Sequence, residues 1–337
     1  MAPGAAEGLV VVDKPPGCTS HDVVAACRRI YRTRRVGHAG TLDPDATGVL
    51  CVGVGSVTRL LRFVGDGWKT YTAEVVLGTS TDTMDDSGKP TGSWDMSHIG
   101  EDAVTEAARR LTGPIMQTPP MVSAVRVGGR RLHQLAREGV VVDRAPRPVV
   151  VRSLALRPTT TSSVWLMDVT CSTGTYVRVL AHDLGAMLGG GAHIRRLRRT
   201  AVGRFTVESA VSLEHLSASA EQAQGALATP LDAVADLARV EVPPEAVGAV
   251  RNGTVFSAPD FSKFRIVSPG PPHEESGDGL HGFPSGRPGV DSGRARQAPA
   301  GDTWAVVSPD GDLLAVYGRY ERGIKPLVVM GAGGGSD

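Results

Sequence analysis

The stretch Gly37–Gly48 reads GHAGTLDPDATG, and the apolar run Val49–Val54 follows it directly. Pro44 disfavours the helical region for Asp43 and pushes that residue toward an extended conformation. Glycines in the stretch let the backbone turn sharply or approach a ligand closely. We therefore expect a loop that presents the Asp43 carboxylate outward as a nucleophile, a base or a capping group, and we assign Asp45 to the turn. Spacing alone also fits an ordinary turn, because Asp before Pro is a common turn signal.

The composition is that of an ordinary soluble globular protein. The 337 residues are 41% hydrophobic and 21% charged, with a formal net charge of +1, and the length is enough for roughly two domains. No apolar run reaches about 18 residues, and Met1–Gly8 lacks a basic, apolar leader, so we expect neither a membrane span nor a secretory signal. The four cysteines form no Cys-x-x-Cys pair, which argues against a zinc site and favours a reducing cytoplasm.

The near-neutral net charge hides clusters of arginine. Five arginines lie between Arg28 and Arg35, four lie between Arg195 and Arg199, and six lie within residues 126–147. Clustered guanidinium groups can bind phosphates bidentately and stack on bases, which favours a nucleic-acid partner. The alternatives are a solvated charged face and a genome-wide preference for arginine, which outnumbers lysine by 31 to 5.

The order of the expected elements indicates an α+β fold. Helices are expected over about Ser20–Ile30, Asp102–Leu111 and Val177–Leu188. Strands are expected at Leu9–Val12, Tyr71–Leu77, Val149–Leu156, Val164–Cys171 and His193–Phe205. Because strands and helices do not alternate regularly, a mixed or antiparallel sheet is favoured over a doubly wound parallel one.

Two segments differ in character from the rest of the chain. Residues 121–148 combine an apolar stretch, a glycine pair and a basic helix-like piece, and we expect an inserted, mobile, positively charged arm. A smaller, mostly β unit spans 240–330, with strands at Thr303–Ser308 and Leu313–Tyr320. Residues 268–301 interrupt it with 18 Gly, Pro or Ser residues in 34, a composition that predicts disorder.

The usual cofactor and metal motifs are absent from the sequence. It contains no Gly-x-Ser-x-Gly elbow, no phosphate-binding Gly-Lys-Ser/Thr loop and no His-x-x-x-His pair. Gly53 and Gly55 lack the third glycine of a dinucleotide fingerprint, and the carboxylates of Asp82–Gly88 have the wrong spacing for a calcium loop. With no cofactor and no metal expected, a carboxylate that works alone is the leading candidate.

Several separated motifs together resemble the tRNA pseudouridine-55 synthases, the TruB-type family. They occur in the family's order, cover about residues 9–215, and would be hard to match by chance together. The motifs are DKPPGCTS at 13–20, GHAGTLDP at 37–44, Tyr71, Gly78 followed by Thr81-Asp82-Thr83, PPMVSA at 119–124, GTYVR at 174–178 and GAHIRRLRR at 191–199.

The resemblance implies an isomerase that converts uridine-55 in the T-loop of tRNA to pseudouridine without a cofactor. The base leaves its stack, enters a closed pocket, is detached from the ribose and is rejoined through its C5 atom. Asp43 then corresponds to the nucleophile, attacking either the base or the ribose. Arg178 corresponds to the arginine that pairs with it and keeps it ionised. Tyr71 corresponds to the aromatic that stacks on the flipped base and removes its C5 proton.

Further residues take family roles by the same resemblance. Tyr176 and Leu197 correspond to residues that line the base pocket, and His38 to one that fills the space left by the extruded nucleotide. Lys14 supports the site or a phosphate. From the residues alone, Arg178 and Lys14 fit surface positions. Lys14 also fits a role as a capping residue. Tyr71 fits half-buried packing, Tyr176 and Leu197 fit the core, and His38 fits a solvated loop.

The resemblance also implies the domain organisation and the partners. It divides the chain into a pseudouridine synthase catalytic domain at 9–235 and a PUA-like RNA-binding domain at 240–330. The 121–148 segment becomes a thumb-like arm over the T-loop, where His133 stands in place of the tyrosine that relatives often carry. The arginine clusters become phosphate contacts. The expected partner is the T-arm of tRNA, with no membrane, no obligate protein partner and a monomeric state.

Two other functions remain open from the sequence. One is the catalytic subunit of a guide-RNA-dependent pseudouridylation particle. The other is a tRNA-binding folding chaperone that needs no chemistry, although both activities can coexist in one protein.

Overall fold

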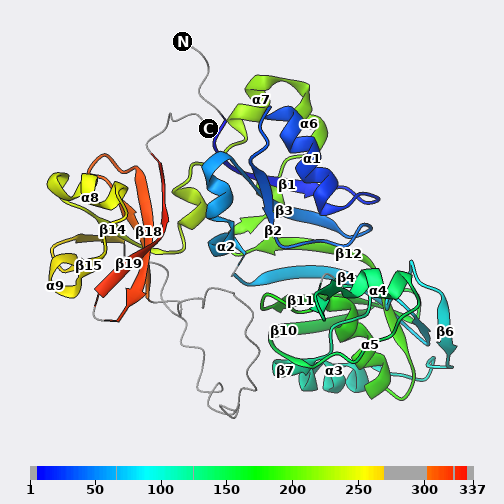
Figure 1. The fold of residues 1–337 in the computed structure, drawn as a ribbon. Coiled ribbons are helices and arrows are strands. Elements are labelled where there is room, and N and C mark those ends of the chain that lie inside the picture. The colour runs from blue at the N-terminus through cyan, green and yellow to red at the C-terminus, as the bar shows by residue number, and fades with distance from the viewer. Residues whose placement is uncertain (1–5, 66, 124, 269–301, 322, 332–337) are drawn as a thin grey trace.

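Two large sheets follow one another along the described part of the chain (Figure 1), and two further pairs of short strands, β5-β6 and β8-β9, accompany the first. The structure is a computed structural model, and it describes residues 6–65, 67–123, 125–268, 302–321 and 323–331. Within these ranges nine strands form the larger sheet and six form the smaller one. Together with the helices that pack on them, these mixed sheets confirm the expected α+β class.

The larger sheet has the strand order β1-β3-β12-β4-β11-β10-β7, with β2 paired to β3 and β13 paired to β12. Among the described strands, β12 pairs with β3 in parallel and the remaining pairs run antiparallel. The strands are β1 (Gly8–Lys14), β2 (Val36–Ala39), β3 (Thr47–Val54), β4 (Lys69–Leu77), β7 (Gly113–Gln117), β10 (Arg147–Pro158), β11 (Val164–Cys171), β12 (Ala192–Val202) and β13 (Phe205–Thr206).

Helix α1 (Ser20–Ile30) begins where its capping residues predict. The Thr19 hydroxyl accepts from the Asp22 N–H at 3.1 Å, and the Asp22 carboxylate accepts from the Thr19 N–H at 2.8 Å. This reciprocal pair satisfies two backbone donors that the first turn leaves free. The buried face of the helix, which includes Val23 and Cys27, packs with Val10 of β1 in one apolar cluster.

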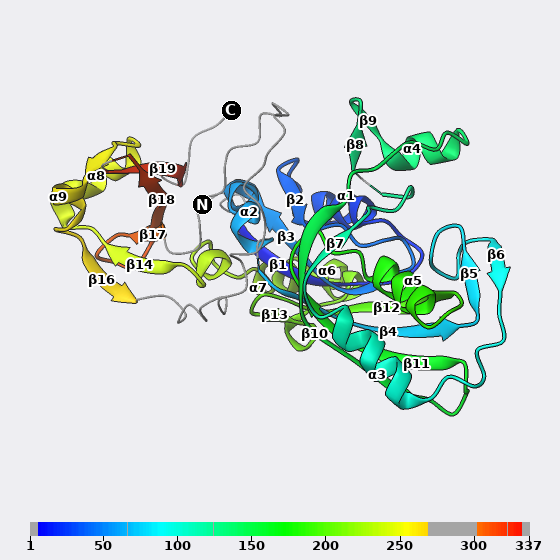
Figure 2. The same ribbon diagram turned by 90° about the horizontal axis from the view of Figure 1, so that it is seen from below.

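Helices α3 (Glu101–Arg110) and α5 (Val177–Met187) pack against the centre of the larger sheet (Figure 2). Every second residue of β4 is buried, so the strand has one core face, as its sequence pattern predicts. Tyr71 and Val75 lie on this face, and Leu180 and Leu184 of α5 belong to the same cluster. Each fully buried Leu or Val stabilises the fold by about 1.5–3 kcal/mol. This packing sets the position of the start of α5 relative to the sheet.

The inserted segment forms a small hairpin and a short helix. The hairpin consists of β8 (Arg126–Val127) and β9 (Arg130–Arg131), and the helix is α4 (Leu132–Arg137). Figure 2 shows these elements projecting away from the larger sheet. The expected arm is therefore a structured projection, and its mobility remains a prediction.

The smaller sheet has the order β15-β19-β18-β17-β14-β16. Val316 and Val328 of this sheet share an apolar cluster with Leu9 and Val11 of β1, so the two sheets are packed together. The expected disorder over 268–301 falls outside the described residues, except for Ser268 at the end of β16. The elements are β14 (Ala238–Glu241), α8 (Val247–Arg251), β15 (Phe256–Ser257), α9 (Ala258–Phe261), β16 (Arg265–Ser268), β17 (Thr303–Val307), β18 (Leu313–Tyr320) and β19 (Gly323–Val329).

Shorter elements connect these parts. They are η1 (Gly55–Arg59), α2 (Leu61–Val64), β5 (Thr79–Thr81), β6 (Pro90–Ser93), η2 (Val207–Ser209), α6 (Leu213–Ala218), α7 (Ala220–Gly225), η3 (Asp232–Val234) and η4 (Pro244–Ala246). Across the part of the chain that the structure describes, the helices are too short or too polar to cross a membrane.

Candidate active site

Asp43 lies in the loop that joins β2 to β3. Buried cationic side chains hold the backbone of this loop through hydrogen bonds to its carbonyls. The Lys14 ammonium donates to the carbonyls of Pro15, Pro44 and Ala46 at 2.9, 2.8 and 2.7 Å. Lys14 is fully buried, so the surface alternative for this residue is wrong. Burial lowers the pKa of Lys14, while the neighbouring Asp45 and Asp43 act in the opposite direction. Support of the loop is the role that these contacts fit, since a buried ammonium cannot meet a phosphate.

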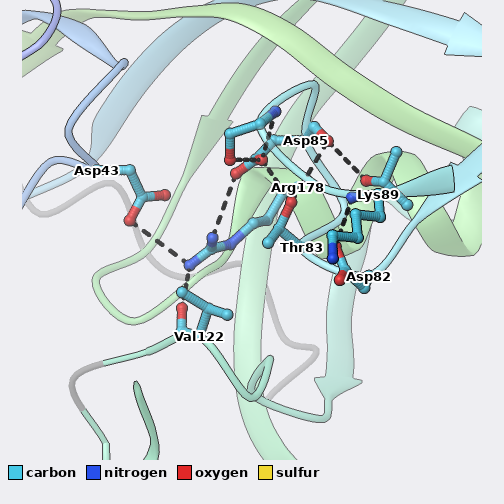
Figure 3. Close-up of polar contacts among 9 residues, drawn as sticks. Asp43, Asp82, Thr83, Asp85, Lys89, Val122 and Arg178 are labelled. Atoms are coloured by element: carbon cyan, nitrogen blue, oxygen red, sulfur yellow. Dashed lines mark hydrogen bonds and ion pairs between the residues drawn. The ribbon is translucent and has the colours of Figure 1, made fainter. Parts of the chain in front are cut away.

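Arg178 projects from the first turn of α5 and meets two carboxylates (Figure 3). One Nη atom lies 3.5 Å from Asp43 Oδ1, and the other lies 3.5 Å from Asp85 Oδ2. The guanidinium also donates to the Val122 carbonyl at 2.5 Å. Only 5% of the Arg178 side chain is exposed, so the alternative of a surface arginine is wrong. The predicted pairing of Arg178 with Asp43 is present, and Asp85 is a partner that the sequence analysis missed.

Asp85 lies in the turn between β5 and β6, and hydrogen-bond donors of that turn hold its carboxylate on the side away from Arg178 (Figure 3). Asp85 Oδ1 accepts from the Thr83 hydroxyl at 2.6 Å, from the Ser87 hydroxyl at 2.5 Å and from the Ser87 N–H at 3.1 Å. These donors leave Oδ2 for Arg178. The signal in the sequence was the acidic run after Thr81, which the sequence analysis considered only as a calcium loop and did not connect to Arg178.

A pocket of about 180 Å³ opens above these groups. Asp43, Asp85, Arg178 and Leu197 line it, together with Asp45, which the sequence analysis assigned only to the turn. The volume and the lining fit a small planar ligand that contacts an apolar wall and a row of polar groups.

The Asp43 carboxylate is 42% exposed and faces this pocket. Removal from bulk water raises its pKa above the usual value, Arg178 lowers it, and the negative charge of Asp85 raises it further. The net effect is that the pKa of Asp43 lies above the usual value for an aspartate. Arg178 thus acts on Asp43 as predicted, but it does not outweigh burial and the second carboxylate.

Of the other predicted pocket residues, Leu197 belongs to the lining of this pocket, whereas Tyr71 and Tyr176 do not. Leu197 lines it directly, in the bulged part of β12. Tyr71 is 7% exposed on β4 and packs with Leu42, so it lies in the core beneath the Asp43 loop. Tyr176 caps the start of α5, where Gln117 accepts from its N–H at 2.9 Å and donates to its carbonyl at 3.3 Å.

His38 lies on β2, so the alternative of a solvated loop histidine is wrong. Its ring meets the ring of His21 edge to face, with the centroids 5.4 Å apart. Burial lowers the pKa of His38 to about 4, and the nearby His21 and Arg199 act in the same direction. The ring is therefore neutral at physiological pH.

Comparison with known proteins places the chain in a family. The model described as the TruB family pseudouridylate synthase N-terminal domain matches residues 28–177, and that of the tRNA pseudouridylate synthase B C-terminal domain matches 178–238. A curated relative, the tRNA pseudouridine synthase B of Symbiobacterium thermophilum, is 46% identical over 250 residues, which cover 73% of this chain and 82% of that protein. The chain belongs to the TruB family of pseudouridylate synthases. The resemblance stated from the motifs is confirmed.

Other TruB-family relatives agree with this assignment. The tRNA pseudouridine synthase B of Thermobifida fusca is 51% identical over 63% of this chain and 75% of that protein. Among solved structures, a Cbf5-Nop10-Gar1 complex matches with a TM-score of 0.67 and 26% identity, over 98% of this chain and 85% of that chain. The archaeal box H/ACA sRNP Nop10-Cbf5 complex matches with a TM-score of 0.67 at 24% identity, over 97% and 88%, which supports the fold alone.

In the arginine cluster of β12, three members form ion pairs while partly exposed, and the fourth is buried. Arg195 and Arg196 share Glu74, at 2.6 and 2.8 Å, and Arg198 pairs with Asp13 at 2.8 Å. Arg199 is 1% exposed, so the expectation of a phosphate contact is wrong for it. The second cluster, between Arg28 and Arg35, is exposed and remains available to a polyanion.

Proposed function

We propose that this chain converts uridine-55 in the T-loop of tRNA to pseudouridine, with Asp43 as the nucleophile. The observation that carries the proposal is the partly exposed Asp43 carboxylate at the pocket wall, paired with a buried arginine. Membership of the TruB family and curated relatives named tRNA pseudouridine synthase B support it. A pocket of about 180 Å³ suits one flipped base.

The contacts suggest how the reaction proceeds. Asp43 in its ionised form attacks the flipped uridine, and Arg178 holds the carboxylate in line while Asp85 holds Arg178. The detached base turns within the pocket against Leu197 and reattaches through C5. Tyr71 stacks on the base from below and accepts the C5 proton, which requires it to become more accessible when RNA binds. The proton lost from C5 is balanced by a proton gained at N1, so substrate and product have the same composition and no cofactor is needed.

The remaining assignments extend the proposal to RNA binding. Tyr176 borders the base pocket, and His38, neutral at physiological pH, fills the space left in the T-loop by the flipped nucleotide. The arm at 121–148 closes over the T-loop with the exposed side chains of Arg126, Arg130 and Arg131. Residues 9–235 act as the catalytic domain and residues 240–330 as a PUA-like RNA-binding domain. The protein works as a cytoplasmic monomer on the tRNA T-arm without an obligate protein partner.

The guide-RNA-dependent alternative has the weaker support. The Nop10-Cbf5 and Cbf5-Nop10-Gar1 structures are 24% and 26% identical to this chain, against 46% and 51% for the tRNA enzymes named above. A direct test is whether the protein alone, without guide RNA, modifies an unmodified tRNA transcript.

Asp43→Asn tests the nucleophile. We expect pseudouridine at position 55 to fall to the uncatalysed level, because an amide cannot attack, while tRNA affinity changes by less than about twofold. The matched control is Asp168→Asn, which removes a carboxylate paired with Arg157 on the other face of the sheet and should keep full activity. Normal turnover by Asp43→Asn would refute the assignment. Folding of tRNA by Asp43→Asn without modification would reveal a separate chaperone activity.

A further inference from the structure

Arg199 is a buried charged residue with no role in the proposed reaction steps. It sits in β12 with 1% of its surface exposed, although the sequence placed it in a basic run suited to phosphate. Burial of a guanidinium is costly unless hydrogen bonds satisfy its N–H groups. The partners of Arg199 therefore show what the residue is needed for.

The first partners are the two ends of the loop that carries Asp43. Arg199 Nε donates to the Val49 carbonyl at 2.7 Å, and one Nη donates to the Gly40 carbonyl at 3.0 Å. Strand β3, which follows the loop directly, also pairs in parallel with β12, where Gly48 lies opposite Arg199. Gly48 has a φ of +99°, and a Cβ there would lie 2.1 Å from the Arg199 carbonyl oxygen, so glycine is required for this approach.

The other partner is Tyr71. Arg199 and Tyr71 lie directly opposite each other on the paired strands β12 and β4. Cross-strand partners place their side chains on the same face of the sheet, so the Arg199 side chain lies next to the Tyr71 ring. Burial raises the pKa of the Tyr71 phenol, and the nearby Arg199 guanidinium opposes that rise.

We infer that Arg199 is a positioning residue, which joins the Asp43 loop and the Tyr71 hydroxyl through one guanidinium and so sets the geometry between the nucleophile and the aromatic. The inference rests on the proposed function. Lys14 supports the same loop through Pro44 and Ala46 but none of its hydrogen bonds goes to Tyr71 within the described structure. The two buried cations therefore form a natural pair for comparison.

The test is a double-mutant cycle with single-turnover pseudouridine formation and tRNA affinity as readouts. Arg199→Lys keeps a cation but loses the planar, forked guanidinium that reaches Val49, Gly40 and Tyr71 in separate directions, and we expect its rate to fall about 10- to 100-fold with tRNA affinity within about twofold. In a Tyr71→Phe background the same substitution should cost much less, because the hydroxyl is already gone. The control Lys14→Met should slow the reaction by the same factor in both backgrounds. Equal costs of Arg199→Lys in both backgrounds would overturn the inference.

A second measurement does not require an Arg199 variant to fold. In the otherwise unaltered chain, Tyr71→Phe should speed hydrogen exchange of the Arg199 side-chain N–H groups, followed by nitrogen-15 NMR, whereas Tyr176→Phe should not. Unchanged exchange in Tyr71→Phe would also overturn the inference. Failure of the proposed function looks different: the unaltered protein would form no pseudouridine at position 55, and the exchange experiment would still report on Arg199.

Discussion

Two loops each bring one aspartate to Arg178, and they hold it in different ways (Figure 3). The turn at 82–89 binds the carboxylate itself, because Thr83 and Ser87 donate three hydrogen bonds to Asp85 Oδ1. The β2–β3 loop is held instead through its backbone carbonyls, by Lys14 and Arg199. Among the described residues, the Asp43 carboxylate has Arg178 as its ion-pair partner.

This difference fits the proposed roles, with Asp85 as a supporting carboxylate and Asp43 as the reacting one. An oxygen that accepts several hydrogen bonds is a poor nucleophile, because those lone pairs are already used and the negative charge is stabilised. A carboxylate on a loop held by its backbone keeps lone pairs free while its position stays defined. The local sequence does not distinguish the two aspartates, since both occur in short loops rich in turn-forming residues, and Asp43 was singled out only by the family motif around it.

We expect the largest loss of activity from removing Arg178, because the aspartates of both loops pair with it. For Arg178→Met we expect kcat to fall about 10³-fold, because the guanidinium both orients Asp43 and favours its ionised form. The measurement is single-turnover formation of pseudouridine, with circular dichroism to check the fold. Arg157→Met, which removes an exposed arginine paired with Asp168, is the control and should keep its activity. A drop of less than tenfold would mean that Arg178 does not serve the nucleophile.

Asp85→Asn keeps an acceptor for Thr83 and Ser87 but turns an amide toward Arg178. We expect kcat to fall about 10- to 100-fold because Arg178 is no longer held in place. The pH dependence should change as well. Asp43 reacts when ionised, so activity is lost as the pH falls through its raised pKa, and loss of the Asp85 charge lowers that pKa. The acidic limb of the kcat/KM profile should therefore move to lower pH. An acidic limb that stays in place or moves to higher pH would exclude the electrostatic coupling between Asp85 and Asp43.

We expect the smallest effect from removing one of the three hydrogen-bond donors to the Asp85 carboxylate. Ser87→Ala removes the hydroxyl donor and leaves the Ser87 N–H and the Thr83 hydroxyl in place. We expect kcat to fall about 2- to 10-fold, the cost of one hydrogen bond to a charged acceptor that keeps its other partners. Ser97→Ala is the control, because Ser97 donates in the same way to Asp95 in an exposed loop outside the pocket lining. Equal activity of the two variants would show that Asp85 needs no support from Ser87.

Local signals predicted much of the fold because they act over a few residues. Thr19 and Asp22 form the cap at the start of α1, and the alternation along β4 follows directly from the period of a strand. The motifs around Asp43, Arg178 and Leu197 also predicted three residues that do meet in one pocket. These features need only the order of neighbouring residues or a match to a family pattern.

The sequence by itself determined several of the main helices and strands, the family and, through the resemblance, the pairing of Asp43 with Arg178. Only the tertiary structure decided which charges are buried and what each one holds. Arg195 and Arg199 look alike in one basic run, yet the first pairs with Glu74 at the surface and the second lies in the core against backbone carbonyls. The physical reason is that the cost of a charge depends on its distance from water and on its partners, and partners more than a hundred residues away along the chain become neighbours only when the sheet forms.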